Sequence, residues 1–223
     1  MDFRHEGKHE ISPGDVLALR ARLSAVMAIA PHARDGRYTV SSLYFDTPDG
    51  RALREKINGV SRREKFRLRY YNSDTSLVLL EKKMKIDGLC SKLQTAVPRE
   101  EAMALVLGEY QAFSRDGPPL LQELYGKMAT QGLRPRTVVR YTREPFIYTP
   151  GNVRVTLDYN IRAGTDCGEF LDPDGCTIPL PNNAAVLEVK WDSFLPSVIR
   201  DLVQIPGVRT GAFSKYAACR VYG

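Results

Sequence analysis

The fold of this chain is decided by residues 63–86, which read REKFRLRYYNSDTSLVLLEKKMKI. Charged and hydrophobic residues alternate on both sides of a polar turn at 72–74, so the stretch predicts two antiparallel strands over 63–71 and 77–86. Successive side chains of a strand point to opposite faces of the sheet. The charged faces of the two strands carry Lys65, Arg67 and Arg69 and then Glu81, Lys83 and Lys85. The opposite faces carry Phe66, Leu68 and Tyr70 and then Val78, Leu80 and Met84.

The same alternation recurs in later segments that also have strand character. Their polar faces carry Arg143, then Arg154, Thr156 and Asp158, and then Glu188 and Lys190. One such strand is typical of an antiparallel sheet with one solvated face. Six strands whose polar faces hold more cations than acids indicate that these faces converge on one polyanion. We therefore expect a closed antiparallel β-barrel with a polar interior, because closure removes exposed sheet edges, and helices that cover its apolar outside.

The remaining elements complete an α+β chain with no visible internal boundary, so we treat residues 1–223 as a single domain. Ser12 is a good helix N-cap and Pro13 suits the first helical position. Further strands are predicted over 3–11, 40–45, 91–97, 136–148, 153–161 and 184–191. Helices are predicted over 13–27, 98–113, 120–128 and 193–203, with a short helix or strand over 213–221.

Composition narrows the class of partner without identifying it. The chain has 223 residues, with 32 lysines and arginines against 26 acidic residues and a formal charge of +6. This excess favours an anionic partner such as nucleic acid, a lipid headgroup or a nucleotide. The longest strongly apolar run, 25–30, is far shorter than the roughly 20 residues that cross a bilayer. With no signal-peptide core at the start and no paired cysteine spacing, we expect a cytoplasmic protein with four free thiols and no membrane span.

The interleaving of cations with core residues distinguishes between these partners. A nucleic-acid-binding surface would place basic residues and aromatics on the outside of the protein. Here the cations would face one another inside the barrel, where their repulsion destabilises the empty protein unless anions or metal ions neutralise it. We therefore expect a multiply charged anion as ligand and no nucleic acid.

A set of short motifs resembles a known family over residues 3–216. The motifs follow the order of the VTC domain, the polyphosphate polymerase domain of vacuolar transporter chaperone proteins, which also occurs as stand-alone bacterial chains and belongs to the triphosphate tunnel metalloenzymes. They are Arg4-x-Glu6-x-Lys8, Tyr44-Phe45-Asp46-Thr47, Arg67-x-Arg69, Glu81-x-Lys83-x-Lys85, Lys92, Tyr141-x-Arg143, Val153-Arg154-Val155-Thr156-Leu157-Asp158, Leu187-Glu188-Val189-Lys190 and Phe213-Ser214-Lys215-Tyr216.

This resemblance implies an eight-stranded antiparallel tunnel that binds triphosphate with divalent manganese or magnesium. The catalytic, phosphate-coordinating positions it implies are Lys8, Arg67, Arg69, Lys83, Arg143, Arg154 and Lys215. The substrate-binding positions are Lys85, Lys92, Lys190 and Ser214, and the metal ligands are Glu188 and Glu6. Lys85 stands where the yeast-type domain has a histidine.

One departure from the superfamily bears on the reaction. Hydrolytic members open with Glu-x-Glu-x-Lys, whereas this chain has Arg4 at the first of those positions. Loss of that acidic ligand weakens a second metal site and the activation of water. The leading hypothesis is therefore a polyphosphate polymerase that moves the terminal phosphate of ATP onto a growing chain. A tripolyphosphatase or nucleoside triphosphatase, and a non-catalytic module that binds polyphosphate or nucleotide, remain alternatives.

Overall fold

A ten-stranded antiparallel sheet dominates the computed structural model, which describes residues 4–109, 117–205 and 213–221. Eight strands follow one another across the sheet. Their order is β1 (His5–Ile11), β10 (Ala185–Trp191), β8 (Val153–Gly164), β7 (Arg134–Tyr148), β3 (Tyr38–Asp46), β4 (Arg63–Tyr71), β5 (Asp74–Ile86) and β6 (Leu89–Val97). Two short strands lie off this path: β2 (Ala28–Ile29) pairs with β7, and β9 (Thr177–Pro179) pairs with β8. The strands predicted from the alternation are confirmed, with small shifts at their ends.

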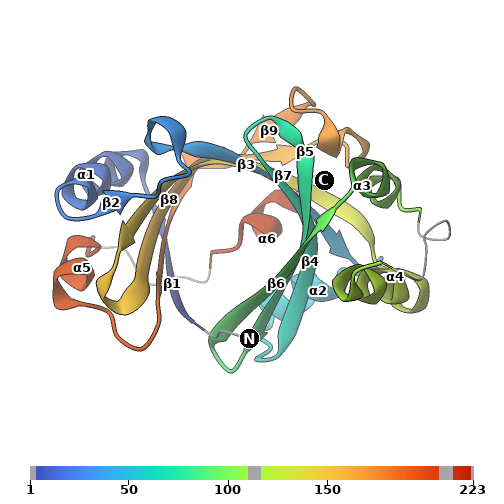
Figure 1. Cartoon of the computed structure of the whole chain (residues 1–223), viewed down its shortest axis with the longest axis horizontal. Helices are drawn as coiled ribbons and strands as arrows, with labels where there is room; N and C mark the ends of the chain where they lie inside the picture. The colour runs from blue at the N-terminus through green and yellow to red at the C-terminus, as the bar shows by residue number, and fades with distance from the viewer. Residues whose placement is uncertain (1–3, 110–116, 206–212, 222–223) are drawn as a thin grey trace.

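The sheet curls around a concave face but stays open (Figure 1). Its edge strands, β1 and β6, meet within the described ranges in one isolated bridge, where Arg4 and Cys90 exchange two backbone hydrogen bonds of 3.1 Å. The predicted closed eight-stranded barrel is therefore wrong. Alternation determines which face of each strand is polar, but it carries no information on whether the first and last strands approach within hydrogen-bonding distance.

The β4–β5 hairpin, formed by residues 63–86, places its charged side chains in rows across the two strands. Arg63 lies opposite Lys85, and Lys65 lies opposite Lys83. The β5–β6 turn has Asp87 at φ 47° and Gly88 at φ 90°. Two left-handed residues in succession are what a tight two-residue hairpin requires. The turn thereby extends the row of charged side chains from β5 to β6.

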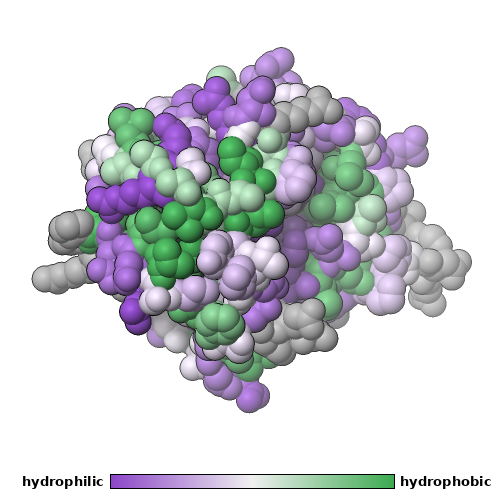
Figure 2. Space-filling model, turned by 60° about the vertical axis from the view of Figure 1, so that its left-hand side comes forward, coloured by the Kyte–Doolittle hydropathy of each residue, from purple (hydrophilic) through white to green (hydrophobic). Residues whose placement is uncertain are grey.

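Helices cover the convex, apolar face of the sheet, as predicted (Figure 1). α3 (Arg99–Val106) and α4 (Pro119–Gln131) pack over β3 to β6, and α1 (Pro13–Ser24) and α5 (Ser197–Leu202) pack over β1, β10 and β8. Fully buried side chains such as Leu68, Leu105 and Leu187 form these cores, and each contributes about 1.5–3 kcal/mol by burial. Figure 2 brings the α1 and α5 side forward and shows hydrophobic patches among polar side chains.

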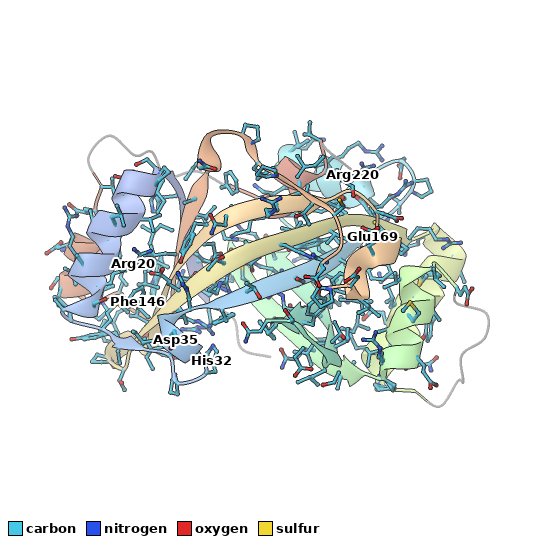
Figure 3. The ribbon with its side chains drawn as sticks, turned by 90° about the horizontal axis from the view of Figure 1, so that it is seen from above. Arg20, His32, Asp35, Phe146, Glu169 and Arg220 are labelled. Atoms are coloured by element: carbon cyan, nitrogen blue, oxygen red, sulfur yellow. The ribbon has the colours of Figure 1, made fainter. Side chains whose placement is uncertain are left out.

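Helix α1 begins where the cap predicts. Ser12 and Asp15 form a reciprocal capping box, with Pro13 at the first turn. The helix ends at Ser24, before the predicted 27. Its Arg20 reaches β7, where the guanidinium pairs with Glu144 at 2.7 Å close to Phe146 (Figure 3).

The other helices differ more from prediction. The helix predicted over 98–113 ends at Val106, and its last predicted residues lie partly outside the described ranges. The one predicted over 193–203 begins only after Pro196, because the residue before a proline avoids helical backbone. None of the helices in the described ranges combines the length and apolar character needed to cross a bilayer.

Two short helices bear directly on the concave face. α2 (Arg51–Ile57) was not predicted; Asp46 accepts hydrogen bonds from the amides of Ala52 and Leu53 at its start. α6 (Lys215–Cys219) lies inside the curve of the sheet (Figure 1). The hydroxyl of Tyr216 in α6 donates to Asp46, which joins the two helices.

Candidate functional site

The concave face holds a cavity of about 740 Å³, the central cavity, which is lined by the eight strands of the path and by α6. Among the residues that the structure describes, fourteen lysines and arginines and three glutamates line it. All thirteen residues with a predicted role are among its lining residues: Glu6, Lys8, Arg67, Arg69, Lys83, Lys85, Lys92, Arg143, Arg154, Glu188, Lys190, Ser214 and Lys215. The structure thus brings the whole predicted set together, while the individual chemical roles stay predictions.

Acids and cations alternate where β1 meets β10. Lys8 lies opposite Glu188 and Glu6 lies opposite Lys190. The Lys8 ammonium is 2.9 Å from Glu6 and 3.4 Å from Glu188, and Lys190 is 2.6 Å from Glu188. Lys83 reaches across from β5 to within 2.8 Å of Glu6. Two carboxylates are therefore surrounded by three ammonium groups.

These charges keep both carboxylates ionised. Burial alone raises the pKa of Glu188, but Lys190, Lys8 and Arg143 outweigh it and hold that pKa well below its usual range. At Glu6, burial and the charge of Glu188 are likewise outweighed by lysines, and the pKa falls to about 2. Both groups are thus available at neutral pH as negatively charged oxygen ligands.

Glu6 and Glu188 suit one divalent cation that arrives with its anion. Within the described ranges, no cluster of three or more His, Cys, Asp or Glu side chains could hold a metal alone. Magnesium commonly uses one or two protein carboxylates and completes its shell with phosphate oxygens and water. Thr156 lies opposite Glu188 on β8, and its buried hydroxyl has no hydrogen-bond partner among the described residues. The donor set therefore fits a metal bound jointly with a phosphate ligand.

A second cluster forms around one carboxylate, that of Glu81, between cavity-lining cations of β4 and β6. Glu81 is fully buried and accepts from Arg67 Nε at 2.7 Å and from Lys92 Nζ at 3.0 Å, with Arg69 at 3.5 Å. Burial raises the pKa of Glu81, but Arg67, Arg69 and Lys92 lower it by more, so the net shift is downward. The alternation placed Glu81 on the charged face, but its role in holding three predicted phosphate-binding cations was missed.

Asp158 organises a third cluster that the sequence did not reveal. It is fully buried and pairs with Arg143 and with the Lys215 ammonium at 2.6 Å. Lys215 comes from α6, whose N-cap is Ser214. The Ser214 hydroxyl accepts from the amide of Ala217 at 3.3 Å, so it caps the helix while also lining the cavity.

Tyrosine rings separate and support the cations. Lys65 lies 4.6 Å from the centre of the Tyr216 ring, and Lys215 lies 4.8 Å from that of Tyr141, which are cation–π distances. Arg154 donates to the Tyr38 hydroxyl at 3.0 Å, while its buried Nε has no hydrogen-bond partner among the described residues. That Nε is a donor available to a ligand.

Four further cations to which the sequence analysis assigned no binding or catalytic role also line the cavity. Lys65 belongs to the alternation with Arg67 and could have been found from it, as could Arg63, whereas Lys56 comes from the unpredicted α2. Burial and the charges of Arg63 and Lys56 lower the pKa of Lys65 to about 8. The fourth, Arg4, pairs with Asp192 at 2.7 Å and so ties the start of β1 to the loop after β10.

A family model for the VTC domain matches residues 3–222. The chain belongs to the VTC domain family. This agrees with the resemblance drawn from the ordered motifs. No curated protein sequence matches the chain.

Several solved structures share the fold of this chain. A candidate adenylyl cyclase from Hippeastrum, HpAC1, described as having a dominant triphosphatase activity, is 15% identical, with a TM-score of 0.55 over 99% of this chain and 96% of that one. The PH1012 protein from Pyrococcus horikoshii is 13% identical, with a TM-score of 0.52 over 96% and 98% of the two chains. A candidate adenylate cyclase from Bacillus halodurans is 13% identical, with a TM-score of 0.51 over 86% and 82%. At these identities the likeness concerns the fold.

Proposed function

We propose that this VTC domain is a metal-dependent polyphosphate polymerase that transfers the terminal phosphate of ATP to a polyphosphate chain. The observation that carries the proposal is the central cavity, where fourteen of the described cations and the ionised pair Glu6 and Glu188 face one shared space. A linear phosphate ligand with several negative charges matches the positive charge of this cavity. It also matches the rows of hydrogen-bond donors that run along neighbouring strands.

The chemistry requires positioning more than covalent assistance. A terminal oxygen of the polyphosphate chain attacks the γ-phosphorus of ATP, a new P–O–P anhydride forms, and the bond to the β-phosphate oxygen breaks to release ADP. The attacking oxygen is already ionised at neutral pH, so no strong general base is needed. Arg67, Arg143 and Arg154 would align the phosphates and neutralise charge in the transition state.

Glu6 and Glu188 would hold the divalent cation, manganese or magnesium. When bound, such an ion neutralises phosphate charge and orients the transferring group. The lysines around these carboxylates are positioned to move from them to phosphate oxygens when the ligand enters. The ammonium groups of Lys8 and Lys190 each lie within 4 Å of both carboxylates. These ion pairs can therefore rearrange locally.

Incubation with ATP and manganese tests the proposal directly. We expect ADP release together with long-chain polyphosphate, resolved on a gel and digested by an exopolyphosphatase. Stoichiometric release of orthophosphate instead of chain growth would identify a hydrolase. Tight nucleotide binding without any turnover would identify a binding module and contradict the proposal.

A triphosphatase is the second candidate, favoured by the fold shared with HpAC1 and its described activity. Arg4 counts against it, because its guanidinium pairs with Asp192 where a hydrolase would supply another acidic ligand. The decisive comparison is orthophosphate release from tripolyphosphate by the natural chain and by Arg4→Glu. A marked gain in the variant would show that this position selects the acceptor.

A further inference from the structure

A second cavity adjoins the central one on the other side of the β4–β5 hairpin. This outer cavity has a volume of about 510 Å³ and lies between α2, the end of α4 and the outer face of β4 and β5. Arg63, Glu64, Lys65 and Lys85 line both cavities. The two spaces therefore meet at one end of the hairpin.

The cations at this junction lack the carboxylates that neutralise the other described cations of the central cavity, Arg154 excepted. Deeper in the central cavity Arg67 pairs with Glu81 and Arg143 pairs with Asp158. By contrast, Arg63, Lys65 and Lys85 have no carboxylate within 4.0 Å among the described residues. The same holds for Lys56 beside them.

The shared glutamate does not compensate this charge. Glu64 is held on the outer face by Lys82 at 3.0 Å and by Lys127. Across the hairpin Arg63 faces Lys85 and Lys65 faces Lys83, and like charges directly opposite one another destabilise a sheet. Burial, and after it the charge of neighbouring cations such as Arg63, lowers the pKa values of Lys56 and Lys65. The junction is therefore the place where an added anion relieves the most repulsion.

The outer cavity continues this positive surface. Six cations and two glutamates of the described part of the chain line it. Arg62 has a side chain 79% exposed and its nearest carboxylate, on Asp87, is 3.9 Å away. Arg51 pairs with Glu55 on one exposed turn of α2, a weak interaction that a phosphate can replace. Both arginines line the outer cavity and not the central one.

The spacing of these groups exceeds what a triphosphate can span. Along β4, Arg69 at the central cavity and Arg63 at the junction are six residues apart, roughly 20 Å at about 3.3 Å per residue, and Arg62 of the outer cavity precedes Arg63. We propose that the outer cavity is a binding site for linear polyphosphate, which leaves the central cavity past Lys65 and Lys85 and continues over Arg62 and Arg51. This inference rests on the proposed function, because it assigns a path to the chain that the central cavity would build.

The test compares two probes of different length on the whole chain. Sodium tripolyphosphate and long-chain sodium polyphosphate are titrated into the natural chain and into the double variant Arg51→Glu/Arg62→Glu by calorimetry. The control is Arg22→Glu/Arg200→Glu, on α1 and α5, which changes the net charge equally on the opposite side of the molecule (Figure 1). We expect the first variant to weaken long-chain binding roughly tenfold and to flatten its salt dependence, because fewer counterions are released.

The remaining outcomes separate this inference from the proposed function. Tripolyphosphate affinity should change less than twofold in both variants, which also reports an intact central cavity. Equal losses for both probes in the first variant, or an equal loss of long-chain binding in the control, would overturn the outer site. ATP turnover is measured in parallel: absence of chain growth in the natural chain contradicts the polymerase, whereas a length-selective loss of binding still supports the outer site.

Discussion

Arg143 and Asp158 form a two-pronged ion pair beneath the central cavity, with Nε 2.7 Å from Oδ1 and Nη2 2.7 Å from Oδ2. The same carboxylate binds Lys215 of α6. Burial raises the pKa of Asp158, but Arg143 and Lys215 outweigh it and the net shift is downward. One carboxylate therefore both orients two cations of the cavity and fastens α6 to the sheet.

Asp158→Ala should destabilise the protein by about 3–5 kcal/mol, because it leaves two buried cations unpaired. Urea unfolding measures the loss. Saturating tripolyphosphate should restore part of it, since the anion binds only the folded state. Asp192→Ala removes an exposed partner of Arg4 and serves as the control, with little expected change. A loss no greater than that of the control would contradict the assigned role.

Glu188→Gln should lower metal-dependent turnover of ATP by about 100-fold or more, because it removes a charged ligand of the proposed metal. ADP release measures this. Tripolyphosphate binding without metal should persist, since the change removes a negative charge from an anion site. Glu10→Gln on β1 lies outside the cavity lining and is the matched control. Undiminished turnover by Glu188→Gln would exclude a metal role for this residue.

Arg154→Ala should weaken tripolyphosphate binding roughly 10- to 100-fold, because a charge-assisted hydrogen bond from the unpartnered Nε contributes about 1.5–3 kcal/mol. Isothermal titration calorimetry measures the affinity. Arg162→Ala removes the same side chain from the same strand at a position outside the cavity lining. Similar affinities for the two variants would show that Arg154 does not contact the ligand.

Tripolyphosphate affinity should fall as the pH rises above about 8, because Lys65 loses its charge there. Lys83 and Tyr44 have pKa values near 8 as well, so the difference between the natural chain and Lys65→Met isolates the contribution of Lys65. A lysine whose folded pKa is lowered binds fewer protons when folded than when unfolded. The stability of the ligand-free natural chain should therefore gain from Lys65 between about pH 8 and 10.5.

Thermal melts of both chains across this pH range, with and without tripolyphosphate, check both effects. In the natural chain, the stabilisation by tripolyphosphate should shrink above pH 8 more than in Lys65→Met. Parallel pH profiles for the two chains would show that Lys65 stays charged in the folded protein, or that it lies outside the ligand site.

The strands, and the strand faces that line the central cavity, were predictable from local alternation, whereas Ser214 and Lys215 at α6 were proposed from the family resemblance alone. Arg67, Arg154 and Lys190 each share a strand face with other polar residues, and a period of two determines that face whatever the strand pairs with. The start of α1 was equally local, because Ser12 and Pro13 indicate it from adjacent positions. In contrast, α2 was missed because its start is stabilised by Asp46, which precedes the turn at 47–50.

The amino-acid sequence alone determined which residues face the concave side and that they carry a surplus of cations. Only the tertiary structure decided that the sheet stays open and that α6 lies inside its curve. It also decided which carboxylate neutralises which cation, as Glu81 does for Arg67 and Asp158 does for Arg143. The difference has a physical cause. The direction of a side chain depends on the backbone of its own strand, whereas closure and charge pairing depend on distances between strands far apart in the chain.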